Sequence, residues 1–518
     1  TWVANLSGTY KNVRIGKAAT NGSTQNSTKF TVDRIRATGD VELYGGEIVL
    51  TGGITTSATS GKGIVVKATG DINVSSGTAV SRNPMSVTGT NSTAPVTLWS
   101  NADATGGGSI SIGNYVDVST RGADIVFGGS AAASDTSPTT HADGVNAGTC
   151  DGIRLGSSAV ANGSVAVNSN GGNITLRGKN TLNSASCMGI KVFSGTAINS
   201  GVGAILLDGV SVAPSGGNNG HGIELNWNGG FNTTVTSAKA SGIAISMTGR
   251  SNGTSTNGRG IVSWSGAASA RTTISATGGG DISLVGSPSS GSSTSITLNW
   301  TDIFAAGGAI TLDGGSKQVR LGETSSTTNF IGGSAANSMS GDVTIKADQV
   351  QFGSTTNAAA FQNATDLFII SNATSFSGAQ VMDTGMSVSN IGYMQVGLAT
   401  NTADITVSGT NSVAGNIDIT GGAVVIGGNQ TATAGGNITI NATGAYSGAG
   451  ALNAAGNVVL NAGSIGGSGN FTSAGTGGIV VTASSGSASF GGNFTANSSA
   501  AAPILLKACL LYTSPSPR

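Results

Sequence analysis

Short runs of alternating polar and apolar residues recur along this chain, and each run follows a glycine. The clearest copies are Gly415-Asn-Ile-Asp-Ile, Gly436-Asn-Ile-Thr-Ile, Gly456-Asn-Val-Val-Leu and Gly478-Ile-Val-Val, whose glycines lie 21, 20 and 22 residues apart. Alternation with a period of two predicts β-strands with one apolar side. Repetition at about 20 residues predicts a stack of similar coils.

One such copy divides into three parts. The β-favouring runs 416–420, 423–426 and 429–432 are separated by Gly-Gly pairs, as expected for three strands and three turns of a β-solenoid coil. A single coil cannot bury its apolar side, so we expect Ile417 and Ile419 to pack against their counterparts in the next coil. A helix is excluded because no period of 3.6 residues survives the glycines. The sequence therefore predicts an all-β solenoid, a parallel β-helix with about 20 residues per coil.

The regularity of this pattern varies along the chain and predicts its organisation. The final residues contain two prolines and no glycine, resemble translated adaptor sequence, and are interpreted as a non-native tail. The predicted segments are an irregular amino-terminal segment (1–38), a β-solenoid shaft (39–347) with a loop leaving the stack (128–147), less regular coils (348–402), regular coils (403–507) and the tail (508–518).

Composition narrows the function. Glycine is abundant, with 85 residues of 518, and charged residues make up only 9%. Lys plus Arg and Asp plus Glu both total 23, so there is no basic surface typical of nucleic-acid binding. No apolar run reaches the ~18 residues of a membrane-spanning segment. The 38% of hydrophobic residues lie in alternating runs, which favours a packed core over disorder.

Three cysteines are too few for a disulfide-stapled scaffold. Cys150 and Cys187 both stand two residues before a glycine that begins a repeat, with the repeat at Gly172 between them. Two coils of separation correspond to about 9.6 Å, which exceeds the ~7 Å limit for a disulfide. The sequence therefore predicts that both are free thiols.

One stretch brings together candidate metal ligands and nearby charged residues: His141, Asp143, Cys150, Asp151 and Arg154. Zinc requires four ligands at tight spacing, and the spacing here is irregular, so no metal or cofactor site is predicted.

His221 and Glu224 are a further pair of ionisable residues. Residues three apart on a strand face opposite sides, so we expect this pair to be exposed polar groups at a corner.

An enzyme that cleaves polysaccharides on this fold needs two or more carboxylates, or carboxylates with Arg and Lys, gathered in one groove. The acidic residues are instead spread along the chain, often at equivalent Gly-Asp corners, so no catalytic residue is predicted. Trp227 and Trp300 each follow a Leu-Asn pair, which places them at strand ends near a corner. Together with Trp99 and Trp264 they are candidate ligand contacts, because aromatic rings stack on sugars, and core filling is the alternative.

Several of these repeats resemble the shaft of filamentous-haemagglutinin-like proteins, the exoproteins of bacterial two-partner secretion. The likeness covers roughly 39–500 and rests on coils such as Gly172-Asn-Ile-Thr-Leu and on Val96-Thr-Leu-Trp-Ser-Asn-Ala-Asp followed by Gly106-Gly-Gly-Ser-Ile. The resemblance implies a right-handed parallel β-helix, a hand that the general crossover rule also favours. It further implies an outer-membrane secretion partner and a secreted or cell-surface location.

We therefore expect a fragment of a longer polypeptide that serves as the structural shaft of a large bacterial adhesin. Stacked coils with little charge suit weak, multivalent attachment to glycans or to host and environmental surfaces, without enzymatic activity. The alternative is a β-helical polysaccharide lyase or glycoside hydrolase. The ligand is not identified by the sequence.

Overall fold

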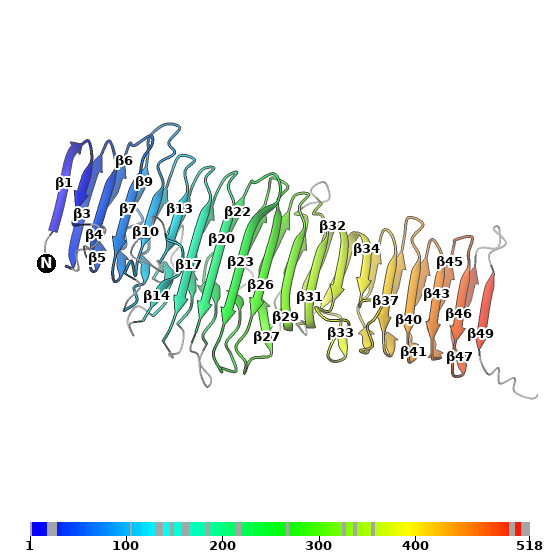
Figure 1. Ribbon diagram of the computed structural model, residues 1–518. Coiled ribbons are helices and arrows are strands. Elements are labelled where there is room, and N and C mark those ends of the chain that lie inside the picture. Colours follow the sequence, from blue (N-terminus) through cyan, green and yellow to red (C-terminus); the bar gives the residue numbers. More distant parts are fainter. Residues whose placement is uncertain are drawn as a thin grey trace, which may run out of the picture. The chain divides into compact units, whose positions relative to one another are not determined.

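The computed structural model describes residues 3–17, 28–103, 106–129, 138–145, 150–157, 165–182, 187–212, 219–265, 269–323, 328–334, 339–353, 358–496 and 503–508. These residues form two compact units, 1–308 and 309–518, in which strands follow one another along the chain (Figure 1). Each unit is a parallel β-helix, which confirms the predicted fold class. Within the described residues no helix has the length and apolar character needed to cross a membrane.

Unit 1 has three strands per coil, and each strand pairs in parallel with its counterpart in the next coil, forming three faces. Face A consists of β2 (Val13–Ile15), β4 (Val41–Gly45), β7 (Ile64–Ala68), β10 (Val96–Trp99), β13 (Ile125–Gly128), β17 (Ile174–Asn180), β20 (Ile205–Ser211), β23 (Ile243–Ser251) and β26 (Asp281–Ser287). Face B consists of the first half of β3 (Phe30–Ala37), β5 (Ile48–Leu50), β8 (Ile72–Val74), β11 (Ile110–Ile112), β15 (Ile153–Leu155), β18 (Ile190–Phe193), β21 (Ile223–Gly229), β24 (Ile261–Ser265) and β27 (Thr294–Leu298). Face C consists of the second half of β3, β6 (Ile54–Thr56), β9 (Asn83–Val87), β12 (Val116–Ser119), β16 (Val165–Asn168), β19 (Ala197–Asn199), β22 (Thr233–Ser237), β25 (Thr272–Ala276) and β28 (Thr301–Ala305). In addition, β1 (Val3–Tyr10) pairs with β3, and β14 (Ala142–Gly144) pairs with β17.

Unit 2 repeats this plan. Its longest ladder joins β29 (Ile310–Leu321), β31 (Val343–Phe352), the second halves of β32 (Ala359–Ile370) and β34 (Met386–Val396), β37 (Ile417–Gly421), β40 (Ile438–Ala442), β43 (Val458–Ala462), β46 (Ile479–Ala483) and β49 (Ile504–Ala508). A second ladder joins β33 (Gln380–Met382), β35 (Ile405–Val407), β38 (Val424–Ile426), β41 (Ala445–Gly448), β44 (Ser464–Gly467) and β47 (Ala488–Phe490). A third joins β36 (Asn411–Val413), β39 (Gln430–Ala432), β42 (Leu452–Ala454), β45 (Phe471–Ser473) and β48 (Phe494–Ala496), while β30 (Asn329–Gly332) pairs with the first half of β32.

The core is built from vertical columns of branched side chains. On face A, Val41, Ile64, Val96, Ile125 and Ile174 occupy the same position in successive coils, and all are completely buried. The residues between them on each strand point outward. This alternation is the one that the sequence pattern predicts, and it lets each coil bury its apolar side against its neighbours.

The coil length varies along the chain. In the later part of unit 2, Ile417 pairs with Ile438 and Ile438 with Val458, so the predicted coil period is confirmed there, whereas Ile310 pairs with Val343 at the start of the same unit. In unit 1, Ile153 pairs with Ile190, which lies much farther along the chain. The glycine-led repeats in this region introduce faces A and B alternately, so the spacing between two successive repeats marks about half a coil.

Some predicted segments contain more structure than expected. The amino-terminal segment 1–38 holds β1, β2 and β3, which stack in register on later coils. The predicted loop 128–147 contains β14, and its residues 130–137 and 146–147 lie outside the described residues. Segment 348–402 carries long, stacked strands, β32 and β34. Of the predicted tail, Ala508 belongs to β49, and 509–518 lie outside the described residues.

Candidate functional site

Polar residues that follow the repeat glycines hold consecutive coils in register. The Oδ1 atom of Asn416 accepts a hydrogen bond from the backbone N–H of Asn437 at 2.8 Å, and Asn437 does the same for Asn457 at 2.8 Å. In unit 1, Asp124 accepts the N–H of Asn173 at 2.7 Å. Each side chain therefore satisfies a turn N–H of the next coil, which explains why Asn or Asp recurs at this position.

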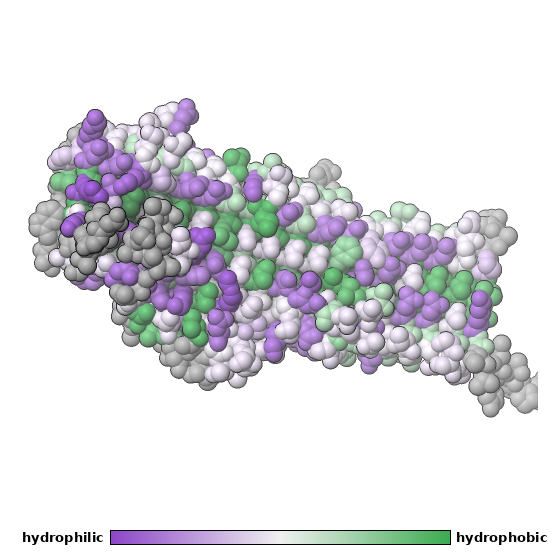
Figure 2. All heavy atoms as spheres, viewed as in Figure 1, coloured by the Kyte–Doolittle hydropathy of each residue, from purple (hydrophilic) through white to green (hydrophobic). Residues whose placement is uncertain are grey.

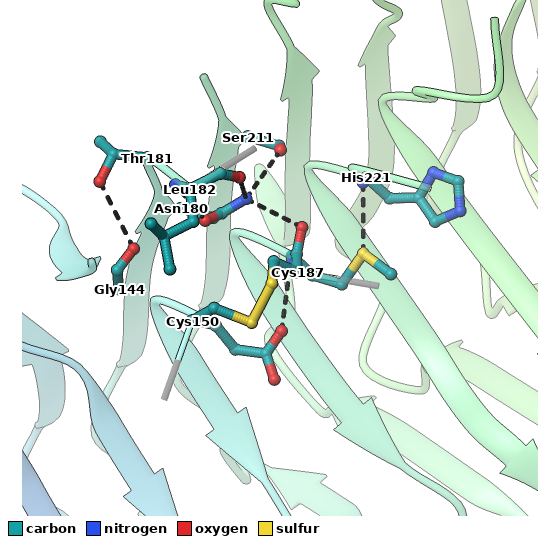
Figure 3. Close-up of a disulfide and its surroundings, with 10 residues drawn as sticks. Gly144, Cys150, Asn180, Thr181, Leu182, Cys187, Ser211 and His221 are labelled. Atoms are coloured by element: carbon teal, nitrogen blue, oxygen red, sulfur yellow. Dashed lines mark hydrogen bonds between the residues drawn. A yellow bond between two sulfur atoms is a disulfide. The ribbon is translucent and has the colours of Figure 1, made fainter. Parts of the chain in front are cut away.

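A second ladder of this kind runs beside face B, and its residues come immediately before the repeat glycines. Asp151 Oδ1 accepts the N–H of Met188 at 2.8 Å, the Met188 sulfur accepts the N–H of His221 at 3.2 Å, and His221 Nδ1 accepts the N–H of Arg259 at 3.2 Å. Figure 3 draws the contact between the backbone of His221 and this sulfur. These four residues, which we call the face B row, come from four consecutive coils.

A disulfide joins the first two coils of this row. Cys150 and Cys187 are bonded, with 5.3 Å between their Cα atoms (Figure 3). The prediction of free thiols was wrong because it placed a whole coil between them. Since Ile153 pairs directly with Ile190, the two cysteines lie on adjacent coils, within reach of each other.

A pocket of about 320 Å³ is lined by His221 and Arg259, the last two residues of the face B row, and by residues around them. It combines two indole rings with two amide side chains, an imidazole, a guanidinium and one carboxyl group. Its lining residues are Asn219, His221, Glu224, Trp227, Asn257, Arg259 and Trp264. The prediction that His221 and Glu224 would face opposite sides as exposed groups was wrong: His221 precedes β21 and is not part of the strand alternation, and both side chains are buried.

Glu224 is the carboxyl group of this pocket. It stands on β21 beside Lys191 of β18 in the ladder, and its side chain is only 2% exposed. Its Oε2 atom has no hydrogen-bond partner among the described residues. Burial raises the pKa of Glu224 to about 8, an effect that nearby Asp151 reinforces and that Lys191 and Arg259 partly oppose. At neutral pH this side chain is therefore mostly a carboxylic acid.

His221 is neutral as well. Burial lowers the pKa of its imidazole to about 3, and the positive charges of Arg259 and Lys191 act in the same direction. Because Nδ1 accepts a hydrogen bond from Arg259, the single proton of the neutral ring resides on Nε2. His221 therefore presents a hydrogen-bond donor.

The two tryptophans lie close to cations. The ammonium of Lys191 is 4.2 Å from the ring centroid of Trp227, and the guanidinium carbon of Arg259 is 5.9 Å from that of Trp264. Trp264 keeps 38% of its surface exposed, whereas Trp227 is half-buried. Two of the candidate tryptophans, Trp227 and Trp264, thus line one pocket, and nothing in the sequence indicated that they would lie together.

Trp300, another predicted ligand contact, lies elsewhere. It occupies the turn between β27 and β28 with a φ of 50°, and it is half-buried beneath the guanidinium of Arg271, 5.5 Å from its ring centroid. It is not among the residues that line the described pocket. It does not belong to the buried core either, so a ligand contact through Trp300 stays a prediction.

The stretch considered for metal binding is divided among different partners. His141 Nε2 lies 3.1 Å from Asp208, Asp143 is paired with Lys179 at 3.0 Å, and Cys150 is in the disulfide. Within the described residues, no three His, Cys, Asp or Glu side chains come together as metal ligands would.

A wider groove of about 680 Å³ crosses β9, β12 and β16 on face C. Small and polar residues line it, and its one carboxylate, Asp117, is held by Arg82 at 2.6 Å. On the visible surface of each unit, hydrophilic and hydrophobic residues are interspersed (Figure 2). The face B pocket differs from this background in gathering aromatic rings and buried ionisable groups at one point.

No family model, curated protein or solved structure matches this chain.

Proposed function

We propose that this chain is a β-helical part of an exported bacterial surface protein that attaches to glycans, and that the face B pocket is a sugar-binding site. One observation carries the proposal: exposed Trp264 and half-buried Trp227 line one pocket with amide, imidazole and guanidinium groups. Indole rings pack against the apolar faces of sugars, while polar groups around them bind hydroxyls.

Two further features support export and surface attachment. The Cys150–Cys187 disulfide is typical of proteins that fold in an oxidising compartment outside the cytosol. The repeats resemble the shafts of filamentous-haemagglutinin-like adhesins, so an outer-membrane secretion partner is part of this proposal. Weak binding by one chain becomes firm attachment when many chains act together.

A glycan array tests the proposal. The purified protein, displayed on beads, should bind a subset of glycans, and the Trp264→Ala variant should weaken this binding about tenfold or more, as for a central aromatic contact. Trp300→Ala is the matched control and should leave binding unchanged. Equal binding by the wild type and Trp264→Ala would contradict the assignment of the pocket.

Glu224 gives a specific reason to consider cleavage of polysaccharides as a second function. A carboxyl group that stays protonated near pH 7 can act as a general acid. A glycoside hydrolase pairs this acid with a second carboxylate, and the described residues lining the pocket include one carboxyl group only. This favours binding. Release of reducing or unsaturated sugar ends that Glu224→Gln abolishes would favour the enzyme instead.

A further inference from the structure

We infer that the face B pocket binds an acidic sugar, whose carboxylate group faces Arg259, His221 and Glu224. The inference rests on the sugar-binding function proposed above and specifies its ligand.

The first reason is the hydrogen-bonding character of the pocket. His221 holds its proton on Nε2 because its Nδ1 accepts a hydrogen bond from the backbone N–H of Arg259. The guanidinium group of Arg259 carries only donors. Glu224 is one of the residues that line the pocket; it is 2% exposed, and its buried Oε2 atom lacks a partner among the described residues. As a carboxylic acid it also supplies a donor. Three donors that line one pocket match a ligand group that only accepts hydrogen bonds, as a carboxylate does.

Charge is the second reason. Lys191 from β18 and Arg259 from the segment before β24 both act on Glu224, as does Asp151 from the segment before β15. Burial raises the pKa values of Asp151 and Glu224, so protonation of these carboxyl groups becomes easier. When these carboxyl groups are protonated, they no longer balance the positive charges of Lys191 and Arg259. An anion that enters the pocket is therefore attracted more strongly than it is repelled.

The aromatic residues are the third reason, because they make the ligand a sugar and not a simple anion. Trp227 and Trp264 line the same pocket, and each carries a cation near its ring, Lys191 and Arg259 respectively. A ring with one apolar face and a carboxylate substituent satisfies both features. A pocket of about 320 Å³ accommodates one or two sugar units.

The protonation of Glu224 gives the inference a distinctive pH dependence. Above a pKa of about 8 the side chain becomes a carboxylate, loses its donor and repels the carboxylate of the ligand. His221 does not titrate in this range, since burial lowers its pKa to about 3. Because the competent form falls about tenfold between pH 7 and pH 9, the apparent affinity falls by about the same factor.

The experiment compares two probes that differ in one group. An oligosaccharide containing glucuronic acid is tested beside the same oligosaccharide with its carboxyl groups reduced to hydroxymethyl, by calorimetry at constant ionic strength. We expect the acidic probe to bind at least tenfold more tightly at pH 7, and this preference to shrink about tenfold at pH 9. Glu224→Gln keeps a donor that cannot ionise, so its affinity should be equal at pH 7 and pH 9.

A second pair of variants separates a local effect from general electrostatic attraction. Arg259→Gln should reduce the affinity for the acidic probe about tenfold or more, whereas Arg121→Gln, an exposed arginine at the face C groove, should not change it. Thermal unfolding of each variant verifies that it is folded. Equal loss in both variants would overturn the inference.

The outcomes also distinguish this inference from the function on which it rests. If the reduced, neutral probe binds as well as the acidic one, and Trp264→Ala abolishes both, the pocket binds sugars but the inference is wrong. If neither probe binds and the glycan array is negative, both the inference and the proposed function fail. A pH dependence that persists in Glu224→Gln would assign the titration to another group and contradict the role of Glu224.

Discussion

The side chain of Asn437 illustrates how one atom fixes the register of two coils. Its Oδ1 accepts the N–H of Asn457, a turn donor that has no strand partner of its own, while its own N–H is accepted by Asn416. An N–H left unsatisfied would cost about 1–3 kcal/mol if buried and less where water reaches it. The Gly-Asn/Asp-Ile pattern of the sequence is therefore a register code as well as a strand signal.

Replacing Asn437 tests this code. Asn437→Ala removes the acceptor and should destabilise the stack by about 1 kcal/mol, whereas Asn437→Asp keeps Oδ1 and should be nearly neutral. The direct measurement is hydrogen exchange at the Asn457 amide, which should become faster in the alanine variant. Thr439→Ala, an outward position on the same coil, serves as the control. Unchanged exchange at Asn457 would mean that this hydrogen bond does not stabilise the stack.

Glu224 makes a prediction about stability as a function of pH. Its pKa is about 8 in the folded protein and 4.5 ordinarily, so the folded state holds a proton that the unfolded chain releases. The stabilisation that this proton provides is complete below pH 4.5 and is lost as the pH rises towards 8. Glu224→Gln does not titrate, so it should raise the unfolding temperature relative to wild type more at pH 8 than at pH 5. A constant difference would argue against the shifted pKa.

The site could be predicted only in part from single residues. Trp227 was identified because Leu-Asn precedes it, and it lines the pocket. His221 and Glu224 were named as a pair, but their convergence with Arg259 and Trp264 depends on the pairing of β21 with β24, two strands that are distant in sequence. The sequence near His221 and Glu224 does not show which later strand will pair with β21, because the connecting residues between strands vary in number and follow no alternation.

At the scale of strands and coils, the strands were predicted correctly but the number of residues per coil in unit 1 was not. The glycine-led strands were identified correctly, for example at Ile153, Ile174 and Ile190. Two of the three strands in each coil of this region begin with the same pattern, on face B and on face A, so one coil was counted as two. The disulfide between Cys150 and Cys187 exposes the error, since it can form only between neighbouring coils.

The disulfide should contribute measurably to the stability of face B. It joins two cysteines with a sequence separation of 37, and the chain-entropy estimate for such a loop is about 3–4 kcal/mol. Reduction, or replacement of both cysteines by serine, should therefore lower the unfolding temperature and accelerate exchange at the Met188 amide. Peptide mapping without reductant should recover the two cysteines in one linked peptide. Two separately alkylated cysteines in protein from the oxidising compartment would contradict the bond.

For each unit as a whole, alternation and repetition were sufficient to predict a parallel β-helix. The reason is physical, because a coil of three short strands has no core until another coil covers it, so strand pattern and fold are nearly the same information. The same dependence makes stability a property of neighbouring coils. A local defect should not be felt far along the stack.

A core substitution in the regular coils tests this locality. Ile440 is completely buried between Ile419 and Leu460, so Ile440→Ala should cost about 2–5 kcal/mol. Faster hydrogen exchange should be confined to the amides of β37, β40 and β43. Amides of β17 and β20 in unit 1 serve as the internal control. Faster exchange in those strands as well would show that the chain unfolds as one cooperative body.

The two coil lengths have a consequence for how such chains acquire binding sites. The shorter coil, as between Ile417 and Ile438, is fully used by three strands and three tight turns. The longer coils, which stack Ile153, Ile190, Ile223 and Ile261, complete the same core and have residues left over. Some of these, such as His221 and Arg259, join the strand residues Trp227 and Trp264 in the walls around Glu224. Insertion of chain at a turn therefore changes the outer surface without altering the columns inside. Once the faces are assigned, a long spacing between two glycines of the same face indicates a coil with extra residues, and therefore a place where the outer surface can form a pocket.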